Sequence, residues 1–163
     1  MRKNLILAVA SVLLAERASA GPLDSPLPTL STGKASLVAT VSGVVNAAGL
    51  ATFFSCTNQS SEAVQMTVGI FVDDGGDPCN DEATAAVTVP PGGTRVMSTQ
   101  NNVQSSYFST NPVSVTDMFI AIGSARVLST GKGMACSSWV ADVYDSPPSS
   151  SYSLAMAFRG KQK

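Results

Sequence analysis

The acidic loop at residues 73–82 is the place in this sequence where side chains able to do chemistry are most concentrated. Five of the ten carboxylates that follow residue 20 lie in it, together with one asparagine: Asp73, Asp74, Asp77, Asn80, Asp81 and Glu82. Hard oxygen ligands in a glycine-containing loop are what calcium prefers, although the spacing does not match the EF-hand pattern. The loop therefore predicts either a calcium site or a solvated hairpin loop whose carboxylates keep a sheet edge soluble.

Catalytic groups are scarce in the rest of the chain. The sequence contains no histidine, which excludes Ser-His-Asp and Cys-His arrangements and most zinc sites. Ser129 and Lys132 are close in sequence, but in a serine-rich chain such proximity is expected by chance. The sequence thus predicts a protein that is not an enzyme.

Three cysteines in a chain with an export signal predict a disulfide, and the odd number leaves one cysteine over. Cys56 and Cys136 lie in segments with a strand pattern, whereas Cys79 lies in the acidic loop. An inter-sheet bridge needs partners in facing strands, so the geometry favours a disulfide between Cys56 and Cys136. Cys79 is left over, and because an exported thiol tends to find a partner, we expect some disulfide-linked homodimer through it.

The first 20 residues have the pattern of a secretory signal peptide. Arg2 and Lys3 precede an apolar run over residues 5–15, and the small residues 18–20 supply a cleavage site. The run is shorter than the about 20 residues that span a bilayer, and no second apolar run follows it. We expect a secreted or periplasmic protein whose mature chain is not inserted in a membrane.

Removal of residues 1–20 from the 163-residue chain leaves 143 residues, enough for one domain with its own core. Seven basic and ten acidic side chains give this part a net charge of −3, so it lacks the basic footprint of a nucleic-acid binder. Residues 21–33 are rich in proline and predict an extended linker, which leaves residues 34–160 as the domain.

The stretch from Leu50 to Val72 has the clearest strand pattern. Apolar residues alternate from Val64 to Val72, a period of two that fits a strand with one apolar face. The polar connector at residues 57–62 predicts a chain reversal, so we expect the strands on its two sides to pair antiparallel.

Further short apolar segments, separated by turn residues, complete the chain. They predict strands at residues 34–45, 83–89, 94–100, 114–122, 124–130, 134–144 and 151–159, with Gly43 as a bulge or bend. In the last segment Tyr152, Leu154, Met156 and Phe158 share a face, which predicts a strand with its large side chains inward. Eight or nine short strands at this spacing indicate an all-β sandwich or barrel.

Three stretches together resemble a widespread, functionally uncharacterised family of small exported bacterial proteins: FFSCTNQSSEAVQMTVGIFV, IGSARVLSTGKGMACSSWVAD and PPSSSYSLAMAFR. The shared features are a Cys-Thr-Asn turn, a Ser-Thr segment that runs into a second cysteine, and a following aspartate; here they are Cys56-Thr57-Asn58, Ser129-Thr130, Cys136 and Asp142. The resemblance implies an immunoglobulin-like antiparallel β-sandwich from about Lys34 to Arg159 and supports the pairing of Cys56 with Cys136. It implies no activity.

Two classes of function follow from these patterns. The first is a structural or interaction module of the bacterial envelope or the extracellular space, which binds a protein or polymer partner by a sheet edge or a loop end. Its candidate contacts are Trp139, Tyr144 and Tyr107. The second is a ligand-binding module, for calcium or carbohydrate, centred on residues 73–82. We expect the first because the sequence offers no reactive group, and an exposed apolar edge would favour it.

Overall fold

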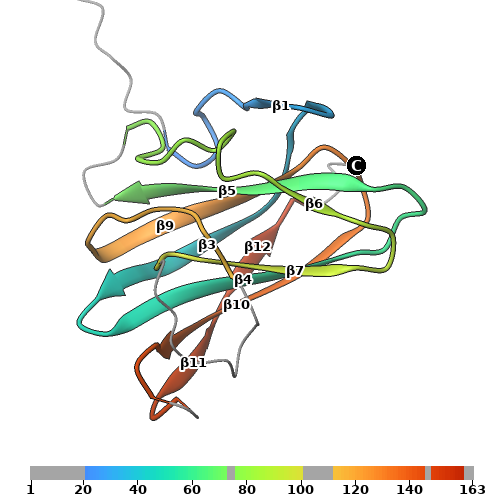
Figure 1. The fold of residues 1–163 in the computed structure, drawn as a ribbon. Helices are drawn as coiled ribbons and strands as arrows, with labels where there is room; N and C mark the ends of the chain where they lie inside the picture. The colour runs from blue at the N-terminus through green and yellow to red at the C-terminus, as the bar shows by residue number, and fades with distance from the viewer. Residues whose placement is uncertain (1–20, 73–75, 101–111, 146–147, 160–163) are drawn as a thin grey trace, which may run out of the picture.

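The structure, a computed structural model, describes residues 21–72, 76–100, 112–145 and 148–159 (Figure 1). These residues form twelve strands and no helix, which confirms the predicted all-β antiparallel sandwich. The strands are β1 (Thr29–Leu30), β2 (Gly33–Lys34), β3 (Ser36–Ala47), β4 (Leu50–Asn58), β5 (Val64–Val72), β6 (Val87–Val89), β7 (Thr94–Ser98), β8 (Val113–Ser114), β9 (Ile120–Ser129), β10 (Met134–Asp142), β11 (Ser151–Leu154) and β12 (Met156–Phe158). The predicted signal peptide lies outside the described residues.

Strands β3 to β12 are hydrogen-bonded into one ten-stranded sheet, which folds into two layers that face each other across one core (Figure 1). We call these layers the first and the second sheet. The first sheet has the order β6-β5-β9-β3-β12, and the second sheet has the order β11-β10-β4-β7-β8. The two sheets are joined at the β3–β4 hairpin and along the last segment, where β11 pairs with β10 and β12 pairs with β3. Apart from the parallel pair β7–β8, the strands pair antiparallel.

The core between the sheets is apolar and draws on both of them. From β5 it takes the alternating residues Val64, Met66, Val68 and Ile70, which confirms the apolar face predicted from the sequence. Its other buried members include Val41, Val44, Phe54, Cys56, Val89, Met97, Ile120, Ala125 and Val127. Gly43 has a φ of 80° at a register shift of β3, so the predicted bulge is confirmed.

The connector between β4 and β5 reverses the chain, but the predicted pairing of these two strands is wrong. β4 pairs with β10 and β7 in the second sheet, whereas β5 pairs with β9 and β6 in the first. The buried Asn58 fixes this crossing, because its Nδ2 donates to the carbonyls of Glu62 (2.7 Å) and Val89 (3.1 Å). Its Oδ1 accepts from the Ser60 amide at 2.9 Å. Polar turn residues predict a reversal but not the sheet that the chain enters next.

Two further strand predictions need correction. Residues 114–122 and 124–130 do not form two strands, because β9 runs unbroken through Gly123, opposite Val44 of β3 and Val72 of β5. A side chain at Gly123 would lie 2.6 Å from the Phe71 carbonyl oxygen, which explains how glycine suits an interior position of this strand.

The last segment is less buried than its pattern predicts. Leu154 and Met156 pack against the core, but Tyr152 and Phe158 are 51% and 52% exposed. The reason is that the segment changes sheets at Ala155, so its two ends lie at the edges of different layers.

The proline-rich segment at residues 21–33, predicted to be an extended linker, instead packs on the outer face of the first sheet (Figure 1). Its strands β1 and β2 pair only with each other. Leu30 and Ala35 are buried against Leu128 of β9. The prolines restrict the backbone without preventing this docking, because they lie outside the paired residues.

Candidate functional site

The acidic loop continues the edge of β5 where β6 ends. β6 pairs only with residues 64–66 of β5. Beyond it, the Asn80 side chain takes the place of a strand, since its Oδ1 accepts from the Ile70 amide and its Nδ2 donates to the Val68 carbonyl, both at 2.8 Å. The Cys79 amide donates to the Ile70 carbonyl at 2.8 Å. Asn80 therefore closes an open sheet edge.

Asp81 caps a turn at the surface. Its carboxylate accepts from the Thr84 hydroxyl (2.7 Å), the Thr84 amide (3.2 Å) and the Ala83 amide (3.0 Å). These hydrogen bonds, that of the Thr84 hydroxyl first, hold the pKa of Asp81 below its ordinary value.

Glu82 is buried and forms an ion pair with the fully buried Arg126 of β9. The pair is bidentate, with Nε donating to Oε1 at 2.7 Å and Nη2 donating to Oε2 at 2.8 Å. Two further donors of the guanidinium bind the backbone of the N-terminal segment: Nη1 donates to the Ser25 carbonyl (2.8 Å) and Nη2 to the Pro26 carbonyl (2.9 Å). One arginine thus ties the acidic loop and the N-terminal segment to the first sheet.

The sheet is shaped to receive this ion pair. Gly69 of β5 is the register partner of Arg126, and a side chain on Gly69 would lie 1.8 Å from Glu82 Oε1. The Phe71 ring, two residues further along β5, lies 5.4 Å from the guanidinium carbon, in cation–π range. Arg126 is not among the residues predicted from the sequence, although a lone arginine in an apolar strand, with a glycine in the neighbouring strand, is a usable signal.

The predicted calcium ligands are thus engaged in other interactions or lie elsewhere. Asn80 and Asp81 use their side-chain oxygens for backbone amides, and Glu82 uses its oxygens for Arg126. Asp77 is exposed, and Asp73 and Asp74 lie outside the described residues. Among the residues that the structure describes, no group of three or more His, Cys, Asp or Glu side chains could hold a metal ion. Calcium binding stays a prediction.

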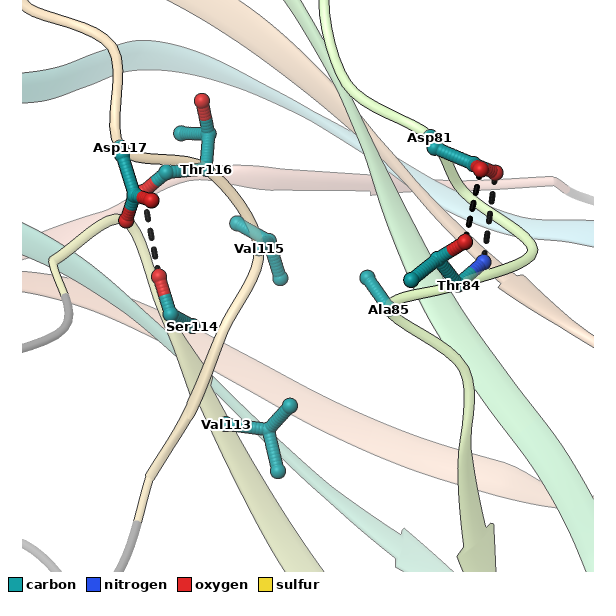
Figure 2. A pocket seen from close by; sticks show the side chains of 8 residues that line it. All are labelled: Asp81, Thr84, Ala85, Val113, Ser114, Val115, Thr116 and Asp117. Atoms are coloured by element: carbon teal, nitrogen blue, oxygen red, sulfur yellow. Dashed lines mark hydrogen bonds between the residues drawn. The ribbon is translucent and has the colours of Figure 1, made fainter.

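A hollow of about 260 Å³ separates this loop from the segment after β8 (Figure 2). Asp81 and Thr84 line one side, and Thr116 and Asp117 line the other. Apolar side chains lie between them: Ala85, Val113 and Val115. The hydroxyl groups here are engaged, since Thr84 donates to Asp81 and Ser114 donates to the Thr116 carbonyl at 3.1 Å. The hollow offers two separated carboxylates and no activated nucleophile among the residues that line it.

The Cys56–Cys136 disulfide predicted from the sequence is confirmed. The two residues are register partners in β4 and β10, with Cα atoms 4.2 Å apart, so the bridge joins neighbouring strands of one sheet and is not inter-sheet. The inter-sheet expectation is wrong because β10 pairs directly with β4. Cys79 is half-buried against the core. The homodimer through Cys79 stays a prediction.

Trp139 lies on the face of β10 that points away from the core, opposite to the disulfide, as its spacing from Cys136 predicts. It stacks on Phe53 of β4, its register partner, with ring centroids 5.6 Å apart and the planes 8° from parallel. Trp139, which was predicted as a contact residue, is half-buried. Part of its surface is therefore used for packing on the outer face of the second sheet.

The end of the sandwich at the β3–β4 hairpin presents two exposed aromatic side chains. Tyr144 is 62% exposed and Phe119 is 73% exposed. They line a hollow of about 260 Å³ with the hairpin residues 46–49, Gln100 and Asp117. We call this region the aromatic end. Tyr144 was predicted as a contact residue, Tyr107 lies outside the described residues, and Phe119 was missed because its segment has a strand pattern.

The aromatic end is held by specific contacts. The Tyr144 ring lies against Gly49, where a Cβ would be 2.8 Å from Cε2, and Gly49 has a φ of 82°, a conformation that favours glycine. The Val143 amide donates to the Gly49 carbonyl at 2.9 Å. Asn46 Nδ2 donates to the Met118 carbonyl at 2.7 Å, next to Phe119. The hairpin, the end of β10 and the segment before β9 therefore form one surface.

The Ser129 and Lys132 pair does not form an evident catalytic dyad. Ser129 is fully buried and its Oγ accepts from the Gly131 amide at 3.1 Å, whereas Lys132 is exposed.

In the described part of the chain, no helix is long and apolar enough to cross a membrane. Comparison with protein-family models, curated proteins and solved structures gives no match to this chain.

Proposed function

We propose that this protein is an exported structural or interaction module of the bacterial envelope or the extracellular space, which acts by binding a protein or polymer partner and not by catalysis. The signal-peptide pattern of residues 1–20 supports export. The Cys56–Cys136 disulfide supports the same compartments, because disulfides persist where the environment is oxidising.

The observation that carries the proposal is the aromatic end. Large apolar side chains are normally buried, and partly exposed aromatics beside polar groups are typical of contact surfaces. Here Phe119 and Tyr144 flank a hollow whose other walls include Asn46, Gln100 and Asp117. A tyrosine ring supplies apolar area with a polar tip, and it loses little conformational freedom when it binds.

The sheet edges support a loop-end contact more than strand addition. The strands at the edges, β6, β8, β11 and β12, are only two to four residues long. Short edge strands protect a sheet from pairing with another chain. Of the two binding modes expected from the sequence, the loop end is therefore the one that we favour.

Site-specific photocrosslinking in the exported protein tests this function. A benzophenone amino acid replaces Phe119 in one variant and Phe158, a second exposed phenylalanine, in the matched control. We expect a discrete crosslinked adduct from position 119 and none from position 158. The mass of the exported chain also reports whether it begins at Gly21. An adduct from neither position, or equal adducts from both, would contradict binding through the aromatic end.

A further inference from the structure

Residues 21–35, which we call the strap, are attached to the sandwich without strand pairing. β1 and β2 form a two-stranded sheet of their own and pair with none of the other described strands. The strap is folded locally, since the Asp24 and Ser25 amides donate to the Gly21 carbonyl and the Ala35 amide donates to the Pro28 carbonyl. Its attachments to the sheet therefore run through side chains.

The strongest attachment is the Arg126 guanidinium, which donates to the Ser25 and Pro26 carbonyls at 2.8 and 2.9 Å. Hydrogen bonds from a charged donor are about twice as strong as neutral ones. Glu82 holds the guanidinium in place from the acidic loop. The N–H donors of Arg126 are thus held in position by Glu82 whether or not the strap is bound.

Two weaker attachments lie further along the strap. Gln65 Oε1 accepts from the Thr32 amide at 3.1 Å, and the Thr32 and Thr130 hydroxyls lie 2.9 Å apart. Leu30 packs on Leu128 at the outer face of the first sheet. None of these contacts involves the core between the sheets or the disulfide, which lie on the other side of the first sheet.

If the strap contacts are lost, few hydrogen-bonding groups of the sandwich are left without a partner. Arg126 would keep its ion pair with Glu82, and water could replace the two strap carbonyls that it binds. Segments held by few backbone hydrogen bonds open locally at a lower free energy than the core.

We propose that the strap undocks as a unit from the outer face of the first sheet while the sandwich stays folded, and that the Arg126–Glu82 ion pair is the latch that holds it. Undocking uncovers Arg126 and the apolar surface around Leu128. The fold therefore has two states, one with this face covered and one with it open.

Hydrogen exchange measured by mass spectrometry on the mature chain tests the latch. Arg126→Lys keeps a positive charge near Glu82 but removes the forked donors that bind Ser25 and Pro26. We expect exchange of strap amides to rise about tenfold, with the β4 and β10 amides unchanged. Arg95→Lys, the same change at an exposed arginine, is the control and should leave the strap unaffected. Unchanged strap exchange in Arg126→Lys, or equal acceleration in β4 and β10, would overturn the proposal.

A second variant tests whether the strap undocks independently of the sandwich if Arg126→Lys does not fold. Gln65→Ala removes the acceptor of the Thr32 amide without leaving a buried charge. We expect faster exchange of the strap amides in this variant and no change in β4. If the strap amides exchange no faster, or only together with β4, the strap is part of the cooperative core and the proposal fails.

Discussion

The outer faces of the two sheets are packed by opposite chemistry. On the first sheet, Arg126 lies opposite Gly69 and forms a buried ion pair with Glu82. On the second sheet, Trp139 lies opposite Phe53 and stacks on it. Each is a single large side chain on the outer face of its sheet. Arg126 is held by directed hydrogen bonds, with Leu30 and Leu128 packed beside it, whereas Trp139 is held by apolar area.

The two arrangements differ in the substitutions that they tolerate. A buried charge is stable only while its partners remain, so removal of one partner leaves a desolvated charge. An aromatic pair contributes area and a modest stacking term, and another apolar side chain replaces most of it. The polar face therefore specifies which segments lie on it, whereas the aromatic face mainly adds stability.

The largest effect should come from the ion pair. Removal of one partner of a buried ion pair costs about 3–5 kcal/mol, and because undocking of the strap lets water reach Arg126, we expect Glu82→Ala to lower the free energy of unfolding by up to this amount. Gly69→Ala should also be strongly destabilising, because the new Cβ would lie 1.8 Å from Glu82 Oε1. Urea denaturation of the mature chain measures both.

The two substitutions should be coupled, because they act on the same carboxylate. In the Glu82→Ala background, Gly69→Ala should cost at least about 1 kcal/mol less than it does in the wild type. Gly21→Ala is the matched control and should change little, because among the described residues other than its chain neighbours no atom lies within 4 Å of the new Cβ. Additive effects of Gly69→Ala and Glu82→Ala would show that the carboxylate is not what the glycine accommodates.

The aromatic face should respond less strongly. Trp139→Leu keeps an apolar side chain over Phe53 but removes the stacking, so we expect a loss of about 1 kcal/mol with the fold retained. Urea denaturation gives the stability, and near-ultraviolet circular dichroism reports the loss of the stacked indole. A loss as large as that of Glu82→Ala would mean that the stacked pair is as sensitive to substitution as the buried ion pair.

The sequence predicts the elements of this fold better than their partners. Alternation in β5 identifies its core face, and the strand contexts of Cys56 and Cys136 identify the disulfide. Both signals are local. The sheet that the chain joins after Asn58 depends on residues distant in sequence. Polar turn residues predict that the chain reverses but not which strands it pairs with next.

The site was harder to predict for the same reason. Glu82 lies among carboxylates, and this local cluster suggested calcium, whereas its actual partner is Arg126, 44 residues further along the chain. The strap carbonyls that complete the arginine site are 100 and 101 residues away from it. Backbone acceptors carry no sequence signal, so the proline-rich segment looked like a linker.

The smallest expected effect concerns two aspartates, the exposed Asp81 and the half-buried Asp142. The pKa of Asp81 is lowered mainly by the Thr84 hydroxyl, and that of Asp142 mainly by the Tyr144 amide, with the Ser149 hydroxyl second. A lowered pKa means that each carboxylate stabilises the fold above the ordinary aspartate value of about 3.9, and that this stabilisation is lost as the pH falls through the lowered pKa.

Removal of the two hydroxyl groups should therefore have different effects on the pKa values of the two aspartates. Thr84→Val should raise the pKa of Asp81 by more than Ser149→Ala raises that of Asp142, because the main donor to Asp142 is a backbone amide that the substitution leaves in place. Carboxyl-carbon NMR titration between pH 2 and 6 measures both values. An equal or larger rise at Asp142 would mean that the Ser149 hydroxyl, and not the Tyr144 amide, is the dominant donor to that carboxylate.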